Sequence, residues 1–151
     1  NVIITTHIKF EVHNEEIKIK KVENEDLNFL YDLLEHRQEN SNISHKKMPT
    51  FLQHKKFVKS KPYVYWYIVL KNNEKIGSVY ITMINEIGLH LKQNVNNLKL
   101  EKKILNVLML KHPKTRFLIN INPKNEKRIN FLKKNGFNLI QYTFEFTKEK
   151  K

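Results

Sequence analysis

Cysteine is absent from the 151 residues, which excludes disulfide bonds, thiolate nucleophiles and cysteine metal ligands and fits a reducing compartment. Long hydrophobic runs are also missing, since no stretch approaches the roughly 18–20 apolar residues that a membrane-spanning helix requires. Residues 1–9 lack the basic start and the unbroken apolar stretch of a secretory signal. We therefore expect a soluble, cytoplasmic protein that does not insert into membranes.

Acidic residues are scarce, with 15 Asp and Glu against 28 Lys and Arg, so the net charge is +13. An excess of this size attracts phosphate, and a basic RNA-associated domain is one interpretation of it. The lysines are spread along the whole chain, however, which favours solvated surface residues over a nucleic-acid groove. The length and the hydrophobic content of 40% fit a single domain covering residues 1–151.

Alternating apolar residues, typical of strands, recur along the sequence. The turn-forming residues 72–75 join two such stretches into an antiparallel hairpin. The expected strands are residues 17–19, 63–70, 76–84, 86–91, 117–121 and 139–146, with an extra strand within residues 1–16.

Helical spacing of apolar residues predicts helices between these strands. The first covers residues 24–37, with Asn24 as its N-cap. The second is short and begins at Thr50, which forms a capping-box pattern with Gln53. A third ends before Pro113.

The last helix, residues 125–135, lies in the most distinctive segment. Asn125 follows Asn122-Pro123-Lys124 and is placed to cap this helix, and Gly136 is placed to end it in the left-handed conformation. Phe137 then folds back as a hydrophobic contact. This segment resembles the closing strand-helix-strand unit of the GNAT superfamily of acetyl-CoA-dependent N-acetyltransferases. Together with the element order, the resemblance covers nearly the whole chain from about Ile17.

The resemblance implies an α/β (α+β) fold with a mixed, mostly antiparallel central sheet of about six to seven strands flanked by four helices. Acetyl-CoA, the implied cosubstrate, lies in the family where the fourth and fifth strands splay apart, and backbone amides at a helix start hold its pyrophosphate. The residues expected to bind it here are Leu89, Leu91, Asn96, Asn97, Leu98, Lys99, Leu100, Lys102, Asn122 and Asn125.

Two positions depart from the family pattern. The pyrophosphate loop has lost both glycines, and Glu101 stands at the second of them, where its charge repels phosphate. Leu132 stands where many members carry a tyrosine that protonates the departing thiolate. These departures favour, as the alternative to an enzyme, a catalytically degenerate GNAT-fold binding or regulatory module.

Residues 86–91 carry the candidate catalytic groups. Acetyl transfer requires a neutral amine, so a base or a water relay must remove its proton. Alternation places Glu86, Gly88 and His90 on one face of this strand, and we expect Glu86 and His90 to supply the base or relay. The structural alternatives are an ion-paired carboxylate and an ordinary core or surface histidine.

The acceptor side is expected in the two-helix region and the strand beside it, with Arg37, His45, His54 and Trp66 as candidate contacts. This region resembles GNAT members that acetylate amino-sugar nucleotides, which makes such a nucleotide the favoured small-molecule acceptor and a protein amine the alternative. The scattered histidines lack metal-ligand spacing, so we expect no metal. Whether the chain forms a homodimer stays open.

Overall fold

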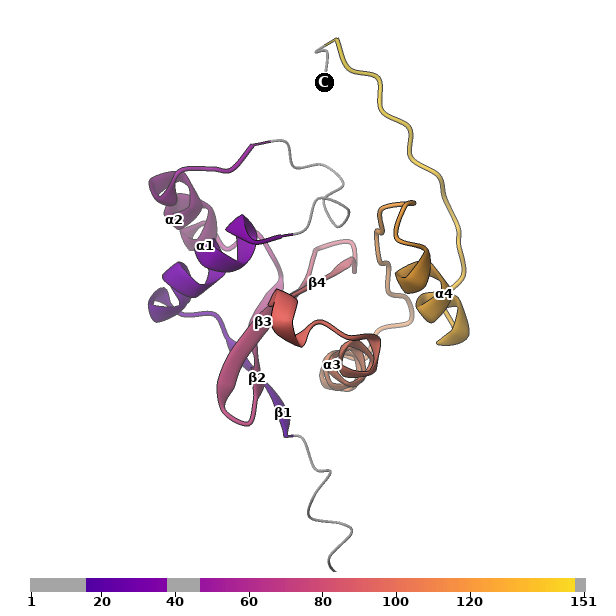
Figure 1. Cartoon of the computed structure of the whole chain (residues 1–151), viewed down its shortest axis with the longest axis horizontal. Coiled ribbons are helices and arrows are strands. Elements are labelled where there is room, and N and C mark those ends of the chain that lie inside the picture. Colours follow the sequence, from indigo (N-terminus) through magenta and orange to yellow (C-terminus); the bar gives the residue numbers. More distant parts are fainter. Residues whose placement is uncertain (1–15, 38–46, 149–151) are drawn as a thin grey trace, which may run out of the picture.

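The computed structural model describes residues 16–37 and 47–148, and Figure 1 shows their arrangement. The extra strand expected within residues 1–16 and the candidate His45 lie outside the described residues. The elements are β1 (Ile17–Lys21), the short 3-10 helix η1 (Asn24–Asp26), α1 (Leu27–Glu35), α2 (Phe51–Lys59), β2 (Tyr65–Lys71), β3 (Glu74–Ile81), β4 (Ile87–Leu91), η3 (Gln93–Val95), α3 (Leu98–Lys111) and α4 (Glu126–Lys134).

The strands form an antiparallel sheet in the order β1-β2-β3-β4, with α1 and α2 on one side and α3 and α4 on the other (Figure 1). One face of the sheet carries Tyr67, Val79 and Leu89, which pack with Ile104 and Leu108 of α3 in the main core. Alternation sends the intervening side chains, including that of His90, towards α1 and α2. The two faces of β4 therefore meet different helices.

Local signals placed most of these elements correctly. In α2, Thr50 Oγ1 accepts a hydrogen bond from the Gln53 N–H at 3.2 Å and Gln53 Oε1 accepts one from the Thr50 N–H at 2.9 Å, which confirms the capping box. The hairpin turn uses Asn72 and Asn73, with φ values of 49° and 65°, as a two-residue turn of primed type requires. Asn24 is not a helix cap: it lies inside η1.

Both ends of α4 also have the expected geometry. Asn125 Oδ1 accepts a hydrogen bond from the Arg128 N–H at 3.3 Å, and Gly136 has a φ of 88°. The Phe137 N–H donates to the Leu132 carbonyl at 3.0 Å, and the Phe137 ring packs against the core. These contacts confirm the cap, the left-handed glycine and the returning aromatic residue.

The expected strand count was wrong, because the described residues form four strands rather than six or seven. Residues 117–121 contribute a single parallel bridge, between Leu118 and Glu86. Residues 139–146 run beside no strand, and Tyr142, Phe144 and Phe146 are exposed. Alternation indicates which face of a segment is apolar, but a strand also needs a hydrogen-bonding neighbour, which alternation does not specify.

The bridge at Leu118 fixes where the sheet opens. The Ile87 N–H donates to the Leu118 carbonyl at 2.7 Å, and the Leu118 N–H donates to the Asn85 carbonyl at 2.9 Å. From residue 88 onwards, no described strand pairs with the outer edge of β4. This free edge borders the site described below.

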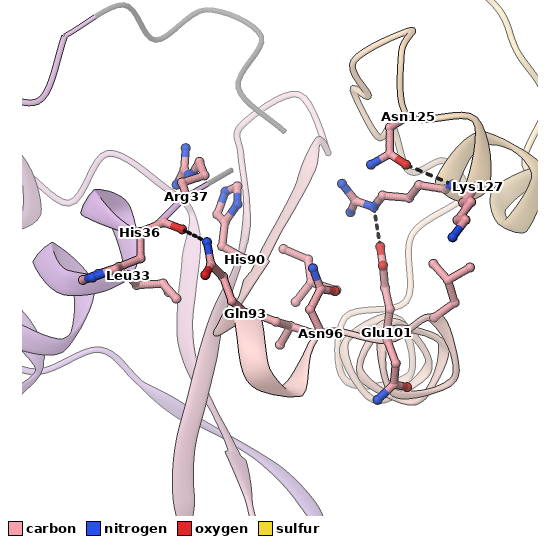
Figure 2. Close-up of a pocket in the computed structure, with 14 residues that line it drawn as sticks. Leu33, His36, Arg37, His90, Gln93, Asn96, Glu101, Asn125 and Lys127 are labelled. Carbon is pink, nitrogen blue, oxygen red and sulfur yellow. Dashed lines mark hydrogen bonds and ion pairs between the residues drawn. The ribbon is translucent and has the colours of Figure 1, made fainter. Parts of the chain in front are cut away.

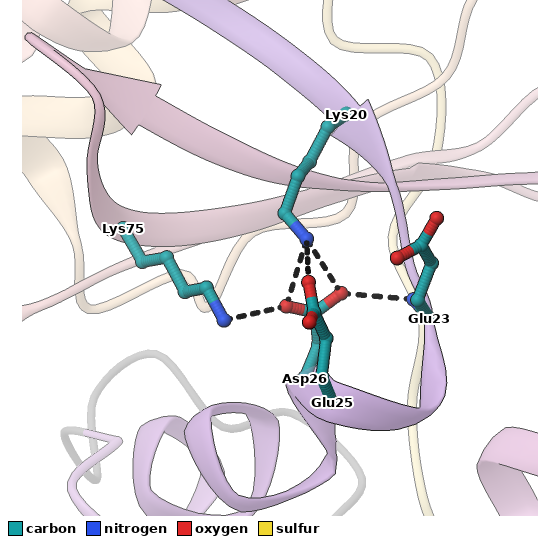
Figure 3. Close-up of polar contacts among 5 residues, drawn as sticks. All are labelled: Lys20, Glu23, Glu25, Asp26 and Lys75. Carbon is teal, nitrogen blue, oxygen red and sulfur yellow. Dashed lines mark hydrogen bonds and ion pairs between the residues drawn. The ribbon is translucent and has the colours of Figure 1, made fainter.

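A buried carboxylate ties β1, η1 and β3 together (Figure 3). Asp26 is 0% exposed and receives Lys75 Nζ at 2.8 Å, Lys20 Nζ at 3.1 Å and the Glu23 N–H at 2.8 Å. Burial by itself would raise the pKa of Asp26, but Lys75, the Glu23 N–H and Lys20 together hold it below its ordinary value. The cluster fixes the start of α1 relative to the sheet. None of the described helices is long and apolar enough to cross a membrane.

Candidate active site

A cavity of about 380 Å³ opens beside the free edge of β4. It is bounded by the end of α1, by β4 with the η3 turn, and by the starts of α3 and α4 (Figure 2). The lining residues are Leu33, His36, Arg37, Leu89, His90, Leu91, Gln93, Asn96, Asn97, Leu98, Glu101, Asn125, Lys127 and Arg128.

The cavity brings together some of the residues singled out from the sequence and leaves others out. Those that line it are Arg37, Leu89, His90, Leu91, Asn96, Asn97, Leu98 and Asn125. Those outside the lining are Glu86, Lys99, Leu100, Lys102, Asn122, His54 and Trp66.

The residues outside the lining have structural surroundings of their own. Leu100 is in the core, while Lys99 and Lys102 point from α3 into solvent. His54 is buried against Tyr31, with ring centroids 5.3 Å apart, so it packs α2 on α1. The remaining two lie in the turn before α4 (Asn122) and in an aromatic cluster on β2 (Trp66).

His90 is the ionisable group of β4 that the cavity contains. It lies opposite Ser78 in the sheet, and its Nε2 is buried without a hydrogen-bond partner among the described residues. Burial, with the positive charges of Arg37 and Arg128, lowers the pKa of His90 to about 3. The imidazole is therefore neutral at physiological pH and able to accept a hydrogen bond or a proton.

Gly88, two residues earlier, leaves room for a neighbouring side chain. A Cβ at this position would overlap the Tyr80 ring, which stacks on Tyr63 at a centroid distance of 3.7 Å. The Tyr80 ring is also 6.0 Å from that of His90. The glycine thus lets an aromatic wall form beside His90.

Glu86 lies immediately before β4. Its N–H donates to Thr82 Oγ1 at 3.1 Å, and it pairs with Leu118 where the sheet opens. Four residues of strand, or about 13 Å, separate it from His90. Its role as a base stays a prediction, and because His90 lines the cavity and Glu86 does not, we favour His90 for that role.

The start of α3 faces the cavity as the expected anion site. Asn97 Oδ1 caps the helix by accepting from the Leu100 N–H at 2.8 Å. Leu98 and Lys99, the first two helical residues, have N–H groups without partners inside the helix, and the helix dipole adds partial positive charge there.

Glu101 and Arg128 form an ion pair that the sequence did not reveal. Arg128 Nε lies 2.6 Å from Glu101 Oε1, and both side chains are largely buried, at 18% and 5% exposed. The carboxylate that replaces a family glycine is thereby neutralised by α4. The sequence held only a weak signal for this pair, because Arg128 lies in the first turn of its helix and its partner lies 27 residues earlier.

Gln93 is a second residue that the sequence did not single out. Its Nε2 donates to the His36 carbonyl at 3.0 Å and so links the end of α1 to the turn after β4 (Figure 2). Arg37 follows His36 in the chain, so this contact holds the backbone of Arg37 beside His90. Within the described residues, no group of three His, Asp or Glu side chains could hold a metal ion.

Comparison with known proteins gives structural likeness only. No protein-family model and no curated protein matches the sequence. Among solved structures, the spermidine/spermine N-acetyltransferase SpeG from Vibrio cholerae has a TM-score of 0.63 at 16% identity, covering 80% of this chain and 78% of that one.

Two further structures contain a cofactor. A predicted acetyltransferase with acetyl-CoA from Clostridium acetobutylicum has a TM-score of 0.61 at 12% identity over 87% of this chain and 96% of that one. An aminoglycoside N-acetyltransferase in complex with CoA has a TM-score of 0.65 at 9% identity over 91% and 97%. The chain therefore has the fold of the GNAT-type acetyltransferases.

Proposed function

We propose that this protein is an N-acetyltransferase that transfers the acetyl group of acetyl-CoA to a primary amine of a small molecule. The observation that carries the proposal is the cavity at the free edge of β4, which joins a capped helix start to a neutral His90 whose Nε2 has no hydrogen-bond partner among the described residues. The likeness to structures that contain CoA or acetyl-CoA supports this cosubstrate.

The residues present fit the pyrophosphate of acetyl-CoA. The start of α3 offers backbone N–H groups, and α4 adds the cations Lys127 and Arg128 at the same end of the cavity. The loop lacks the family glycines, but Glu101 does not present an uncompensated charge, because Arg128 pairs with it. The thioester end would extend along the free edge of β4 towards His90.

In the proposed reaction the amine nitrogen attacks the thioester carbonyl carbon, a C–N bond forms and the C–S bond breaks. The nitrogen loses one proton to His90 or to water, and the sulfur leaves as a thiolate that gains one proton. Leu132 is buried in the core, and no tyrosine is among the described residues that line the cavity, so water supplies the second proton. The products are an acetamide and CoA.

A nucleotide-linked amino sugar is the small-molecule acceptor that we favour, and a protein amine is the alternative. A second function, a GNAT-fold module that binds without catalysis, is favoured by Glu101 and by the apolar Leu132. Binding of acetyl-CoA is common to both functions, whereas acetyl transfer separates them.

The test is calorimetric titration of the protein with acetyl-CoA, followed by an assay of thiol release with a panel of primary amines. We expect saturable heat with a dissociation constant below about 1 mM, a range that covers most enzyme-substrate pairs. Absence of saturable heat would contradict the proposal, and binding without transfer to any amine would favour the non-catalytic module.

Replacing the buried carboxylate is expected to strengthen cofactor binding. In Glu101→Gln the amide keeps the shape and one acceptor oxygen, while the negative charge beside the phosphates is lost. We expect the dissociation constant of acetyl-CoA to fall roughly fivefold, or about 1 kcal/mol for a partly screened charge. Titration calorimetry measures it, with the exposed Glu126→Gln as control. Weaker binding by Glu101→Gln would show that the pair with Arg128 is itself needed for the site.

A further inference from the structure

We infer that the amine acceptor carries an acidic group, a carboxylate or a phosphate, and that Arg37 binds this group at the α1 end of the cavity. The inference rests on the proposed function for the identity of the ligand as an acceptor. Three observations carry it: an arginine donor without a partner among the described residues, the charge balance of the cavity, and the position of this arginine across the cavity from the expected phosphate site.

Arg37 leaves one buried donor, its Nε–H, without a partner among the described residues. Its Nε is buried and has no hydrogen-bond partner among the described residues, and no ion pair of Arg37 occurs there. Burial lowers the pKa of Arg37, whereas the nearby Tyr80 and Tyr63 raise it. The arginine stays charged at physiological pH, because its pKa is far above neutrality. An unsatisfied buried donor is costly, so such a group usually marks a place that a ligand completes.

The charge balance of the cavity selects the sign of that ligand. Among the described residues that line it, Glu101 is the one carboxylate, against the cations Arg37, Lys127 and Arg128. Glu101 is already paired at 2.6 Å with Arg128. Among the described residues, a polycationic amine would therefore meet no unpaired carboxylate and would be repelled by Arg37, whereas an acidic amine finds a guanidinium whose Nε–H has no partner there.

The position of Arg37 separates it from the proposed cofactor contacts. Figure 2 shows Arg37 and His90 on one side of the cavity, and Glu101, Asn125 and Lys127 on the other. The link from Gln93 to the His36 carbonyl holds the backbone next to Arg37 in place. The planar guanidinium, which offers two parallel donors, matches carboxylate and phosphate oxygens better than an ammonium does.

The experiment follows the Arg37 Nε–Hε resonance in the spectrum of 15N-labelled protein saturated with CoA and in the protein alone. The resonance is assigned by its absence from Arg37→Gln. Glucosamine 6-phosphate and alanine supply the phosphate and carboxylate probes. Their uncharged counterparts glucosamine and alaninamide, together with spermidine, serve as controls. Titrations run to about 50 mM, since a single charged contact gives dissociation constants on the order of 10 mM.

We expect at least one acidic probe to shift this resonance saturably, with or without CoA, and the uncharged counterparts and spermidine to leave it unchanged. The arm that responds decides between phosphate and carboxylate. No shift with either acidic probe would overturn the inference, as would equal shifts with spermidine. A shift caused by CoA itself, with no further response to acid, would assign Arg37 to the cofactor and leave the proposed function standing.

Substitutions give the kinetic form of the same test with an acidic amine that is acetylated. Arg37→Gln is expected to raise its KM about 10- to 100-fold and to change the dissociation constant of acetyl-CoA less than about twofold. Arg37→Lys should recover part of the loss, because it restores the charge without the planar fork. The exposed Arg116→Gln is the matched control. Equal loss with acidic and uncharged amines would contradict recognition of the acid.

Discussion

Asp26→Asn is expected to lower the free energy of unfolding by about 3 kcal/mol and the melting temperature by roughly 10 °C. The carboxylate is 0% exposed and neutralises Lys20 and Lys75, which come from different strands. An asparagine can still accept from the Glu23 N–H, but among the described residues it leaves Lys75 without a counter-charge and Lys20 with the exposed Glu25 alone. Chemical denaturation followed by circular dichroism measures the change.

The matched control is Glu25→Gln, which touches the same Lys20 at 3.2 Å from a side chain that is 66% exposed. An exposed pair contributes little, so this variant should lose less than about 1 kcal/mol. If Asp26→Asn were no more destabilised than Glu25→Gln, burial of the carboxylate would not be what stabilises this corner of the fold.

The stability difference between wild type and Asp26→Asn depends on pH with a defined sign. The folded pKa of Asp26 is below 3.8, so its contribution is complete above the unfolded pKa and is lost as pH falls through the folded value. Burial opposes the charge of Lys20, but Asp26 and Glu25 raise its folded pKa above 10.5. The contribution of Lys20 to stability is therefore lost as pH rises through the folded pKa. The stability gap between wild type and Asp26→Asn should therefore be flat from about pH 5 to 9 and narrow at both extremes.

The sequence predicted the features whose partners lie a few residues apart. Thr50 with Gln53, Asn125 with Arg128, and Gly136 at the helix end all depend on one turn of backbone, so their chemistry is readable locally. The resemblance assigned residues 89–103 to the cofactor cleft, and residues 89–98 do form a continuous stretch of β4, η3 and the start of α3 that borders the cavity. Binding of the cofactor by these residues stays a prediction. Half of the candidate site follows from this stretch alone.

The features that were missed depend on residues far apart in the sequence. Gln93 reaches a carbonyl 57 residues earlier, and Arg128 reaches a carboxylate 27 residues earlier. No periodicity encodes such pairs, and Glu101 alone indicates only repulsion of phosphate. Residues 139–146 show the same limit, because their alternation was real but did not specify a neighbouring strand.

His90→Gln is expected to lower kcat/KM for acetyl transfer about 10²- to 10³-fold, equivalent to roughly 3–4 kcal/mol, the usual contribution of a general base. Glutamine keeps a polar group of similar reach but does not accept a proton near neutral pH. Glu86→Gln, immediately before β4 and outside the cavity lining, is expected to change the rate less than about threefold. A large loss in Glu86→Gln with normal activity in His90→Gln would reverse the assignment.

A pKa of about 3 makes His90 a weak base, and the reaction step at which it acts follows from that value. It does not deprotonate a free alkylammonium, whose pKa is near that of a lysine side chain at about 10. Attack on the thioester places a positive charge on the nitrogen and makes its proton far more acidic, so a neutral imidazole can take it at that point.

Because Arg37 contributes to the low pKa of His90, an acidic acceptor bound at Arg37 would raise this pKa and make His90 a stronger base. The pH profile of kcat/KM should therefore show its acidic limb at the pKa of the amine and none near pH 6 to 7. A limb near pH 6.5 that disappears in His90→Gln would show instead that His90 titrates as an ordinary histidine.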